Sequence, residues 1–421
     1  MEQTKNLYVG FDLGNENSQM SCFHPRTGEI ETIGGKTGDN YHFIPTCLAV
    51  TKYRREWLYG EEALFAAEHE DVVLVENFVL RIGNKETFTI LGVTFDGVAL
   101  LEKFFRKTLV LLQKYYSNNS ICKLVVTIEE ENESLTKAIY QALENMGILR
   151  DRVFVETYTQ SYIYYALSQK RELWTQDIGL FDFSKRGLIF KRIRINRRCQ
   201  PFVVACEKTD LSDEISFDMY QRKEKTELAT LFLEVAKMVL YNQNVATLYF
   251  IGEGFLSNWS DYALQVLCTG KRGFRGPNIY TRGAAYHAKN METNEFSKKF
   301  LLLSEGVLED AILLKAYKDG KQREVQIIPA GIPWTQAKGC TTIILDEEDE
   351  IRLVIKNALD MTMSERMIPL EGVPKRPNRM GRFQLEFQFE NLRTCVISIR
   401  DVGFGDYAPS TNRVWEKRME L

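Results

Sequence analysis

Two short stretches of this sequence place an aspartate at the end of an apolar, strand-like run. In the first, residues 8–19 ("YVGFDLGNENSQ"), the run leads into Asp12 and Gly14. In the second, residues 177–195, we expect a strand, a turn around Asp182 and a second strand. Such turns are common because Asn, Asp and Gly tolerate the backbone angles of turns. They can also cradle a phosphate through backbone N–H groups, with the aspartates holding a hydrated Mg²⁺.

The elements around the two turns recur in the same order in both halves of this region. Residues 97–116, 133–147 and 225–240 carry apolar side chains at three-and-four spacing and are predicted helices. Residues 123–128 and 246–255 are predicted strands, the second ending in a glycine turn. The repetition indicates two similar α/β lobes with a cleft between them. Ligands of α/β sheets bind at the carboxyl ends of strands, where the two turns lie.

Beyond about residue 297 the pattern changes to alternation with a period of two. Ile351, Leu353 and Ile355 alternate after an acidic turn, and the alternation is longest in residues 383–399. We therefore predict an antiparallel β-sandwich over residues 305–421.

The length, charge and cysteine content of the chain limit the kinds of partner and the cellular compartment that we expect for it. The chain has 421 residues, enough for two or three domains, and a net charge of −3, which favours neither nucleic acid nor an anionic membrane. It shows no signal peptide and no apolar run near the roughly 18 residues that span a bilayer. Eight scattered cysteines predict free buried thiols in a cytoplasmic protein. No histidine stands beside another candidate ligand, so a transition-metal site is not expected.

Several pieces of the sequence resemble, in order, the motifs of the sugar kinase, actin and heat-shock ATPase superfamily. The run "DLGNENS" resembles the first phosphate loop of the DnaK-type chaperones, and "LFDFSKRG" stands at the second. The pieces "VETYTQSYIYYAL" and "RGAAYHA" resemble the two connecting helices of that superfamily, and "FIGEGF" resembles its adenosine loop. The piece "KKFLLLSEG" resembles the leucine-rich linker of the chaperones. Their peptide-binding β-domain is similar to "QIIPAGIPWTQAKG" and "IPLEGVPKRPNRMGRFQLEFQF". The resemblance covers nearly the whole chain.

This resemblance implies an α/β actin-like (ribonuclease-H-like, duplicated) two-lobe nucleotide-binding fold followed by an all-β sandwich domain. The expected parts are lobe I at residues 1–170, a shortened lobe II at 171–297, a linker at 298–304 and a β-sandwich similar to the chaperones' substrate-binding domain at 305–421. The printed sequence stops soon after the sandwich, so we expect a divergent, lidless relative of the chaperones.

The resemblance also implies a site for ATP or ADP with magnesium. The catalytic group would be Asp12, Glu156 and Asp182, and the two aspartates would hold the metal through water. The nucleotide-binding residues would be Gly14, Asn15, Glu16, Lys185, Gly252, Gly254 and Gly283. Gln160 could orient a water. Both Glu156 and Gln160 could equally be polar residues at a helix end.

The sequence departs from the chaperone pattern where ATP hydrolysis depends on it. Glu16 would repel a phosphate about 4 Å away by about 4 kcal/mol at an effective dielectric near 20. The second loop has lost its triple glycine, and Lys185 and its neighbour Arg186 could contact phosphate or be solvated turn residues. Val79 stands where the chaperones carry the catalytic lysine. Only 70 positions (252 − 182) separate Asp182 from Gly252, too few for the upper subdomain that closes over the adenine.

These departures predict a protein-binding or scaffold module with little or no ATP hydrolysis, at most a weak ATPase. A slow ATP-dependent chaperone and a nucleotide-dependent filament former remain alternatives. Clients would be proteins or extended peptides bound through the β-sandwich, where Ile312, Leu313 and Leu314 could line a groove or pack the core. The basic residues 270–278 are expected to form a solvated turn, not a nucleic-acid contact.

Overall fold

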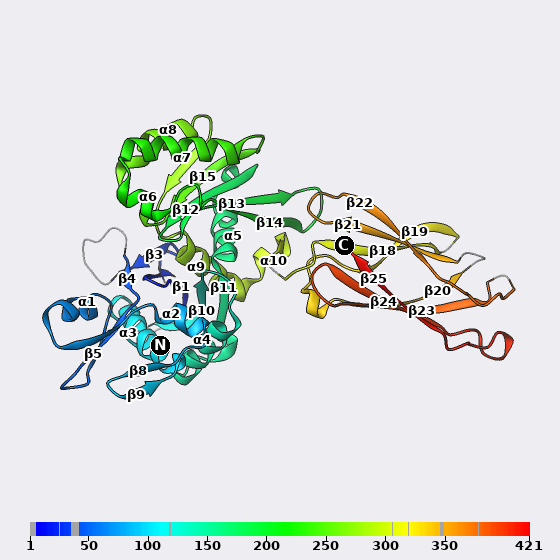
Figure 1. Cartoon of the computed structure of the whole chain (residues 1–421), viewed down its shortest axis with the longest axis horizontal. Helices are drawn as coiled ribbons and strands as arrows, with labels where there is room; N and C mark the ends of the chain where they lie inside the picture. Colours follow the sequence, from blue (N-terminus) through cyan, green and yellow to red (C-terminus); the bar gives the residue numbers. More distant parts are fainter. Residues whose placement is uncertain are drawn as a thin grey trace. The chain divides into compact units, whose positions relative to one another are not determined.

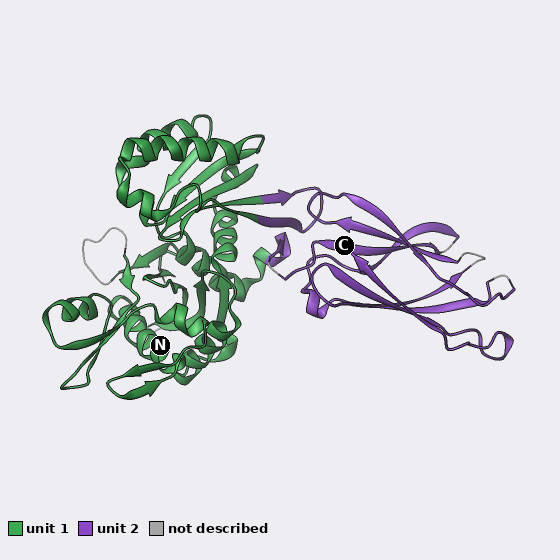
Figure 2. Ribbon diagram, viewed as in Figure 1, with its two compact units in different colours: residues 1–193, 207–296 green, residues 194–206, 297–421 purple. Residues whose placement is uncertain are grey.

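The computed structural model of the chain forms two compact units (Figures 1 and 2). Unit 1 comprises residues 1–193 with 207–296, and unit 2 comprises residues 194–206 with 297–421. The structure describes residues 6–24, 26–34, 42–117, 119–304, 306–318, 320–345, 349–377 and 379–421. Residues 346–348 of the expected acidic turn, and Glu305 at the start of the predicted sandwich, lie outside the described residues.

A mixed six-strand sheet organises the first half of unit 1, with the short strand β4 pairing with β2 off its main path. Its strands follow the order β11-β10-β1-β2-β3, with β1, β10 and β11 parallel and the hairpins β1–β2 and β2–β3 antiparallel. The elements are β1 (Asn6–Asp12), β2 (Asn17–Phe23), β3 (Ile30–Ile33), α3 (Gly97–Tyr115), β10 (Ser120–Ile128), α4 (Glu133–Asn145), β11 (Val153–Thr157) and α5 (Tyr158–Ser168).

The second half repeats this arrangement. Its sheet runs β16-β15-β12-β13-β14-β17, so its first five strands occupy the same relative places as those of the first half. The elements are β12 (Asp177–Ser184), β13 (Gly187–Asn196), β14 (Phe202–Asp210), α7 (Lys225–Leu240), β15 (Val245–Ile251), α8 (Asp261–Leu267), β16 (Arg272–Arg275) and α9 (Ile279–Thr293). Helices follow the third, fourth and fifth strands in both halves. Asp182 lies within β12, so the turn follows it at residues 185–186 instead of surrounding it.

Shorter elements fill the connections of unit 1. The first half carries β4 (Ile44–Pro45), β5 (Leu48–Thr51), β6 (Trp57–Tyr59), α1 (Gly60–His69), β7 (Val72–Val75), α2 (Phe78–Gly83), β8 (Phe88–Ile90), β9 (Val93–Phe95) and η1 (Arg150–Arg152). The second half carries η2 (Arg171–Leu173), α6 (Phe217–Arg222), η3 (Glu253–Phe255) and η4 (Asn258–Ser260). Helix α10 (Glu295–Lys299) follows α9.

The helices predicted at residues 97–116, 133–147 and 225–240 are confirmed as α3, α4 and α7. Each turns its apolar face inward, and two begin at a side-chain cap. Asp96 accepts the Ala99 N–H at 2.8 Å, and Asn132 accepts the Leu135 N–H at 2.9 Å. Gly147, at φ +86°, stops α4 where the sequence pattern places its end.

Helices α5 and α9 cross at Gly283. A Cβ there would lie 1.9 Å from the Ser161 carbonyl oxygen, so the two backbones touch where no side chain fits. On its other side α9 lies against β1, because a Cβ on Gly10 would meet the Thr281 carbonyl oxygen at 2.1 Å. The Thr281 hydroxyl also donates to the Gly10 carbonyl at 3.1 Å. These contacts hold α9 against both α5 and the first strand.

Unit 2 consists mainly of two four-strand antiparallel sheets around one core. The sheets run β19-β18-β21-β22 and β20-β23-β24-β25. The elements are β18 (Asp310–Lys318), β19 (Lys321–Ile328), η5 (Trp334–Gln336), β20 (Lys338–Leu345), β21 (Glu350–Asn357), β22 (Met363–Pro369), β23 (Gly381–Phe389), β24 (Thr394–Asp401), η6 (Gly405–Tyr407) and β25 (Val414–Glu420). The alternating residues of β23 and β24 bury Phe383, Leu385, Phe387, Ile397 and Ile399.

In this region one of two open alternatives is confirmed and one expectation changes. Ile312 and Leu314 pack in the core, and Leu313 is also buried, so these three residues do not line an open groove. Most of the expected linker, residues 298–304, is strand β17 (Phe300–Leu303), which pairs in parallel with β14 from Phe202 to Ala205. An apolar four-residue run is well suited to a buried strand, and its partner lies about a hundred residues earlier in the sequence.

A buried ion pair fixes the loops of unit 2. Both oxygens of Asp401 accept from the Arg376 guanidinium at 2.6 Å, and Asp401 also accepts the Thr411 N–H at 2.8 Å. Asp401 is fully buried. Burial alone would raise the pKa of Asp401, but hydrogen bonds from Arg376 and Thr411 outweigh it and hold this pKa well below its usual range.

The crossing of α5 and α9 yields a stability prediction. Gly283→Ala should lower the free energy of unfolding of unit 1 by about 3 kcal/mol, because the new methyl group forces two helix backbones apart. Thermal unfolding and amide exchange in α5 and α9 would measure the loss. Gly276→Ala is the control, since the nearest atom to its Cβ lies 3.9 Å away. Equal stability of the two variants would contradict the crossing.

The Asp401 pair yields a second prediction. Asp401→Asn should destabilise unit 2 by about 3 kcal/mol, because the variant leaves a buried guanidinium without its counter-charge. The lowered pKa means that this stabilisation is present above about pH 4 and is lost as the pH falls further. Amide exchange in β24 measures the effect. Glu390→Gln, in the exposed pair with Arg418, should change that exchange little, and the idea fails if both variants behave alike.

Candidate functional site

Seven of the ten residues expected to form the site meet at one cavity of unit 1, of about 190 Å³. They are Asp12, Gly14, Asn15, Glu16, Asp182, Lys185 and Gly252. Asp12 ends β1 and Asp182 lies in β12, the corresponding strand of the other half. The duplicated topology therefore brings the two aspartates to the same cavity, as expected for strands of equivalent place in two similar sheets.

A stacked pair of tyrosines lies between these aspartates and the starts of α5 and α9. Tyr158 is the first residue of α5 and Tyr280 the second of α9, and their ring centroids lie 4.0 Å apart with 13° between the planes. The Tyr280 hydroxyl donates to Asp182 at 2.7 Å, and the Tyr158 hydroxyl bonds to Asp12. Each half of unit 1 thus supplies one aspartate and the tyrosine that bonds to it.

The role of this pair was not expected from the sequence. Tyr158 stands in the helix-spaced run of tyrosines that is typical of a core or a lobe interface, and Tyr280 stands in no motif of its own. The available signal was positional, because both tyrosines open the helix that follows the fifth strand of their half. Both are buried, and burial beside a carboxylate raises the pKa of each hydroxyl well above its usual value.

Ion pairs connect the two turns across the cavity. Lys185 Nζ lies 2.7 Å from Glu16 Oε2, so the two residues expected to meet phosphate bond to each other. Arg186 pairs with Glu129, and its guanidinium lies 3.9 Å from Asp182. The Asn17 amide donates to Glu253 at 2.9 Å. The basic residues of the second turn, Lys185 and Arg186, are thus paired with carboxylates of the protein itself and need no bound anion.

Asp12 is the most perturbed carboxyl group at this cavity. It is 7% exposed, and burial raises its pKa to about 7, with the charges of Asp182 and Glu129 acting in the same direction. Its hydrogen bond with Tyr158 opposes the rise without cancelling it. One carboxyl oxygen, Oδ1, is buried without a hydrogen-bond partner.

Glu156 and Gln160 serve the structure of α5. Glu156 accepts the Ser161 hydroxyl at 2.5 Å, and its other oxygen lies 2.5 Å from His287 Nδ1 on α9. Gln160 forms a capping box with Thr157: its side chain accepts the Thr157 N–H at 2.9 Å. Neither residue lines the cavity, which fits the alternative that both are polar residues at a helix end.

The glycines of the motifs have local reasons to be glycine. A Cβ on Gly14 would lie 2.3 Å from the Asn17 carbonyl oxygen, within the turn itself. Gly252, at φ +93°, approaches the Phe183 carbonyl, and Gly254 packs on the Phe183 ring. Neither Gly254 nor Gly283 lines the cavity. Gly283 lies instead at the crossing of α5 and α9. These glycines therefore need no bound phosphate to explain them.

Val79 is the residue that the resemblance to the chaperones would place where they carry the catalytic lysine. Val79 lies in helix α2, 4% exposed, and packs in the hydrophobic core of the first half. A buried valine neither contacts a phosphate nor positions a water. Val79 thus lies in the core and does not line the candidate cavity.

Magnesium ATP does not fit the side chains present at this cavity. Pockets for drug-sized ligands measure roughly 300–1,000 Å³, well above about 190 Å³. Each tyrosine hydroxyl bonds to one of the two aspartates, and the Glu16 carboxylate, which is paired with Lys185, adds negative charge to the cavity lining. Among the described residues, no group of three His, Cys, Asp or Glu side chains could hold a metal ion.

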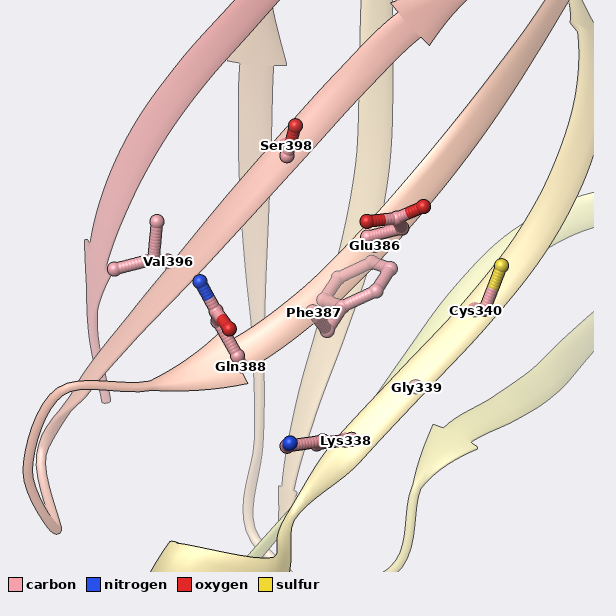
Figure 3. Close-up of a pocket in the computed structure, with 8 residues that line it drawn as sticks. All are labelled: Lys338, Gly339, Cys340, Glu386, Phe387, Gln388, Val396 and Ser398. Carbon is pink, nitrogen blue, oxygen red and sulfur yellow. The ribbon is translucent and has the colours of Figure 1, made fainter.

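A second hollow, of about 430 Å³, lies in unit 2 on strands β20, β23 and β24 (Figure 3). Exposed Lys338, Cys340, Glu386 and Gln388 face it from alternate positions of two of these strands. It collects neither several charges of one sign nor an unpartnered buried group among its lining residues. The cavity of unit 1 is therefore the candidate site. In the part of the chain that the structure describes, no helix combines the length and apolarity that crossing a membrane requires.

The buried Asp12 yields a prediction about pH. The unfolded carboxyl ionises near pH 3.8 and the folded one near 7, so the stability of unit 1 should fall as the pH rises between these values. The full difference corresponds to about 4 kcal/mol. Asp12→Asn should remove this fall. In urea unfolding, the free energy of unfolding of the variant should therefore increase relative to that of the wild type as the pH rises from 4 to 8. Asp261→Asn, in an exposed pair with Arg275, is the control and should follow the wild-type profile.

Comparisons with known proteins place the chain by sequence. A model described as "Family of unknown function (DUF5716) C-terminal" matches residues 29–305, and one described as "Domain of unknown function (DUF8552)" matches residues 307–421. No curated protein matches the chain. The two matches meet near residue 306, close to the division between units 1 and 2 at residue 297. Because the first match spans more than half of the sequence, the chain belongs to the DUF5716 family.

Proposed function

We propose that this protein is a chaperone-like relative of the actin-fold ATPases that binds other proteins, or scaffolds them, without hydrolysing ATP. The fold assignment is supported by the duplicated sheet order, in which two parallel neighbours and two hairpin strands flank the first strand of each half. It is also supported by the helices α5 and α9, which cross at Gly283 after the fifth strand of each half. Fold alone does not fix an activity, so the function rests on the site.

The single observation that carries the proposal is the tyrosine pair. In an ATP site of the kind that the resemblance implies, the two aspartates must be free to hold the water shell of magnesium. Here Tyr158 and Tyr280, at the starts of α5 and α9, bond to the aspartates. The salt bridge between Lys185 and Glu16 also joins the two turns. The cavity of unit 1 is thereby stabilised by its own side chains.

The protein-binding part of the proposal rests on unit 2. Strand β22 lies at the edge of its sheet, and Met363 and Met367 on it are 53% and 65% exposed. An edge strand can accept an extended peptide through backbone hydrogen bonds, and methionine adapts to varied apolar side chains. This edge is therefore the part of unit 2 that best suits an extended client.

Two further observations bear on partner and compartment. Phe274 of the basic stretch stacks on Tyr249, and Arg275 pairs with Asp261, which favours a structural role there over nucleic-acid binding. The eight cysteines are free thiols, which suits a reducing compartment, so a cytoplasmic location belongs to the proposal.

Titration calorimetry tests the proposal. We expect no heat from Mg-ATP or Mg-ADP at millimolar concentration and no phosphate release. Tyr158→Ala combined with Tyr280→Ala should open the cavity to nucleotide, because it removes both rings. The matched control is the Phe pair at the same positions, which keeps the rings and should remain closed.

Two outcomes would favour the alternatives. Steady ATP turnover that Asp12→Asn abolishes would indicate a slow ATP-dependent chaperone. Sedimentation of the protein only in the presence of nucleotide would indicate a filament-forming relative. Either result overturns the proposal.

A further inference from the structure

The cavity of unit 1 is strongly acidic. Five carboxylates line it: Asp12, Glu16, Glu129, Asp182 and Glu253. The basic side chains that line it are Lys185 and Arg186, and each is already paired with one of these carboxylates. An anion such as phosphate would therefore meet a net negative lining, whereas a cation would be attracted to it.

The cavity also contains unpartnered acceptor atoms. Asp12 is 93% buried (100 − 7) and its Oδ1 has no hydrogen-bond partner, although Asp12 lines the cavity. Asn15 Oδ1 and the Ser184 hydroxyl, which line the same cavity, are also buried without partners. A buried acceptor left unpaired costs about 1–3 kcal/mol, more when it is charged. A ligand that brings several N–H donors would remove this cost.

We propose that this cavity binds a compact organic cation, a primary ammonium or guanidinium group on a short carbon chain. The inference rests on the proposed function, because the site can serve such a ligand only if nucleotide does not occupy it. Guanidinium and ammonium groups carry three or more N–H donors and no acceptor, which matches a lining of unpaired acceptors. A cavity of about 190 Å³ admits a small molecule and excludes a nucleotide.

A metal ion fits this lining less well than an organic cation. Within the described residues no three carboxylate, thiol or imidazole groups could hold a metal ion together. Glu16 and Glu129 are engaged in ion pairs and Asp182 accepts from Tyr280, so few of their oxygens are free for a metal. An organic cation can bond to singly placed acceptors, because its N–H groups point in several directions.

The test compares methylguanidinium with methylurea, its neutral isostere, by calorimetry on the full chain at low ionic strength. We expect methylguanidinium to bind and methylurea not to bind at the same millimolar concentration. Asp12→Asn should weaken methylguanidinium at least tenfold. Asp261→Asn, which removes a carboxylate outside the cavity, should leave its affinity unchanged.

Three outcomes overturn the inference. Equal binding of methylurea would show that charge is not recognised, and absence of methylguanidinium binding at pH 8 would show that the cation is not accepted. Binding of Mg²⁺ alone, lost in Asp12→Asn, would assign the carboxylates to a metal. Mg-ATP is titrated in parallel. Its binding refutes the proposed function, whereas silence from both ATP and methylguanidinium refutes the cation site alone.

Discussion

Two buried carboxylates at the junction of two similar sheets must be satisfied, and the rest of unit 1 is arranged around that requirement. Asp12 and Asp182 are 7% and 4% exposed. An ionised group so deeply buried is costly unless it is hydrogen-bonded or paired. The hydroxyls of Tyr158 and Tyr280 supply the hydrogen bonds, and their rings stack to bury each other. The pair supplies two neutral donors that belong to the protein.

The position of the tyrosines depends in turn on how closely two helices approach. Gly283 lets α9 touch α5 at Ser161, and the Glu156 carboxylate connects Ser161 to His287, one turn after Gly283 on α9. Tyr164 stacks on the His287 ring at 4.1 Å, which adds an aromatic contact to the same junction. Glu156 thus contributes to the site by holding the helices together, at a distance from the cavity.

Local patterns in the sequence were enough for much of the fold. The spacing of Leu135, Ile139 and Leu143 predicts α4, and the alternation from Phe383 to Phe387 predicts β23, because both signals depend only on near neighbours. The positions of Asp12 and Asp182 in the first strand of each half likewise indicated that they lie at one site. Pairings between distant segments could not be read in this way. Strand β17 needs β14, and the tyrosine stack needs a helix crossing, neither of which leaves a periodic signal.

The two halves of the site are alike in topology but unlike in charge, and this asymmetry decides what the cavity can do. On the side of Asp182, the Arg186 guanidinium lies 3.9 Å away, and Lys191 Nζ lies 3.4 Å from the Tyr280 hydroxyl. On the side of Asp12, a tyrosine bonds one oxygen and the other oxygen has no partner. The cations Arg186 and Lys191 therefore lie close to the Asp182 side, whereas Asp12 keeps an unmet acceptor. Because only the Asp12 side lacks a partner, a bound positive group belongs beside Asp12.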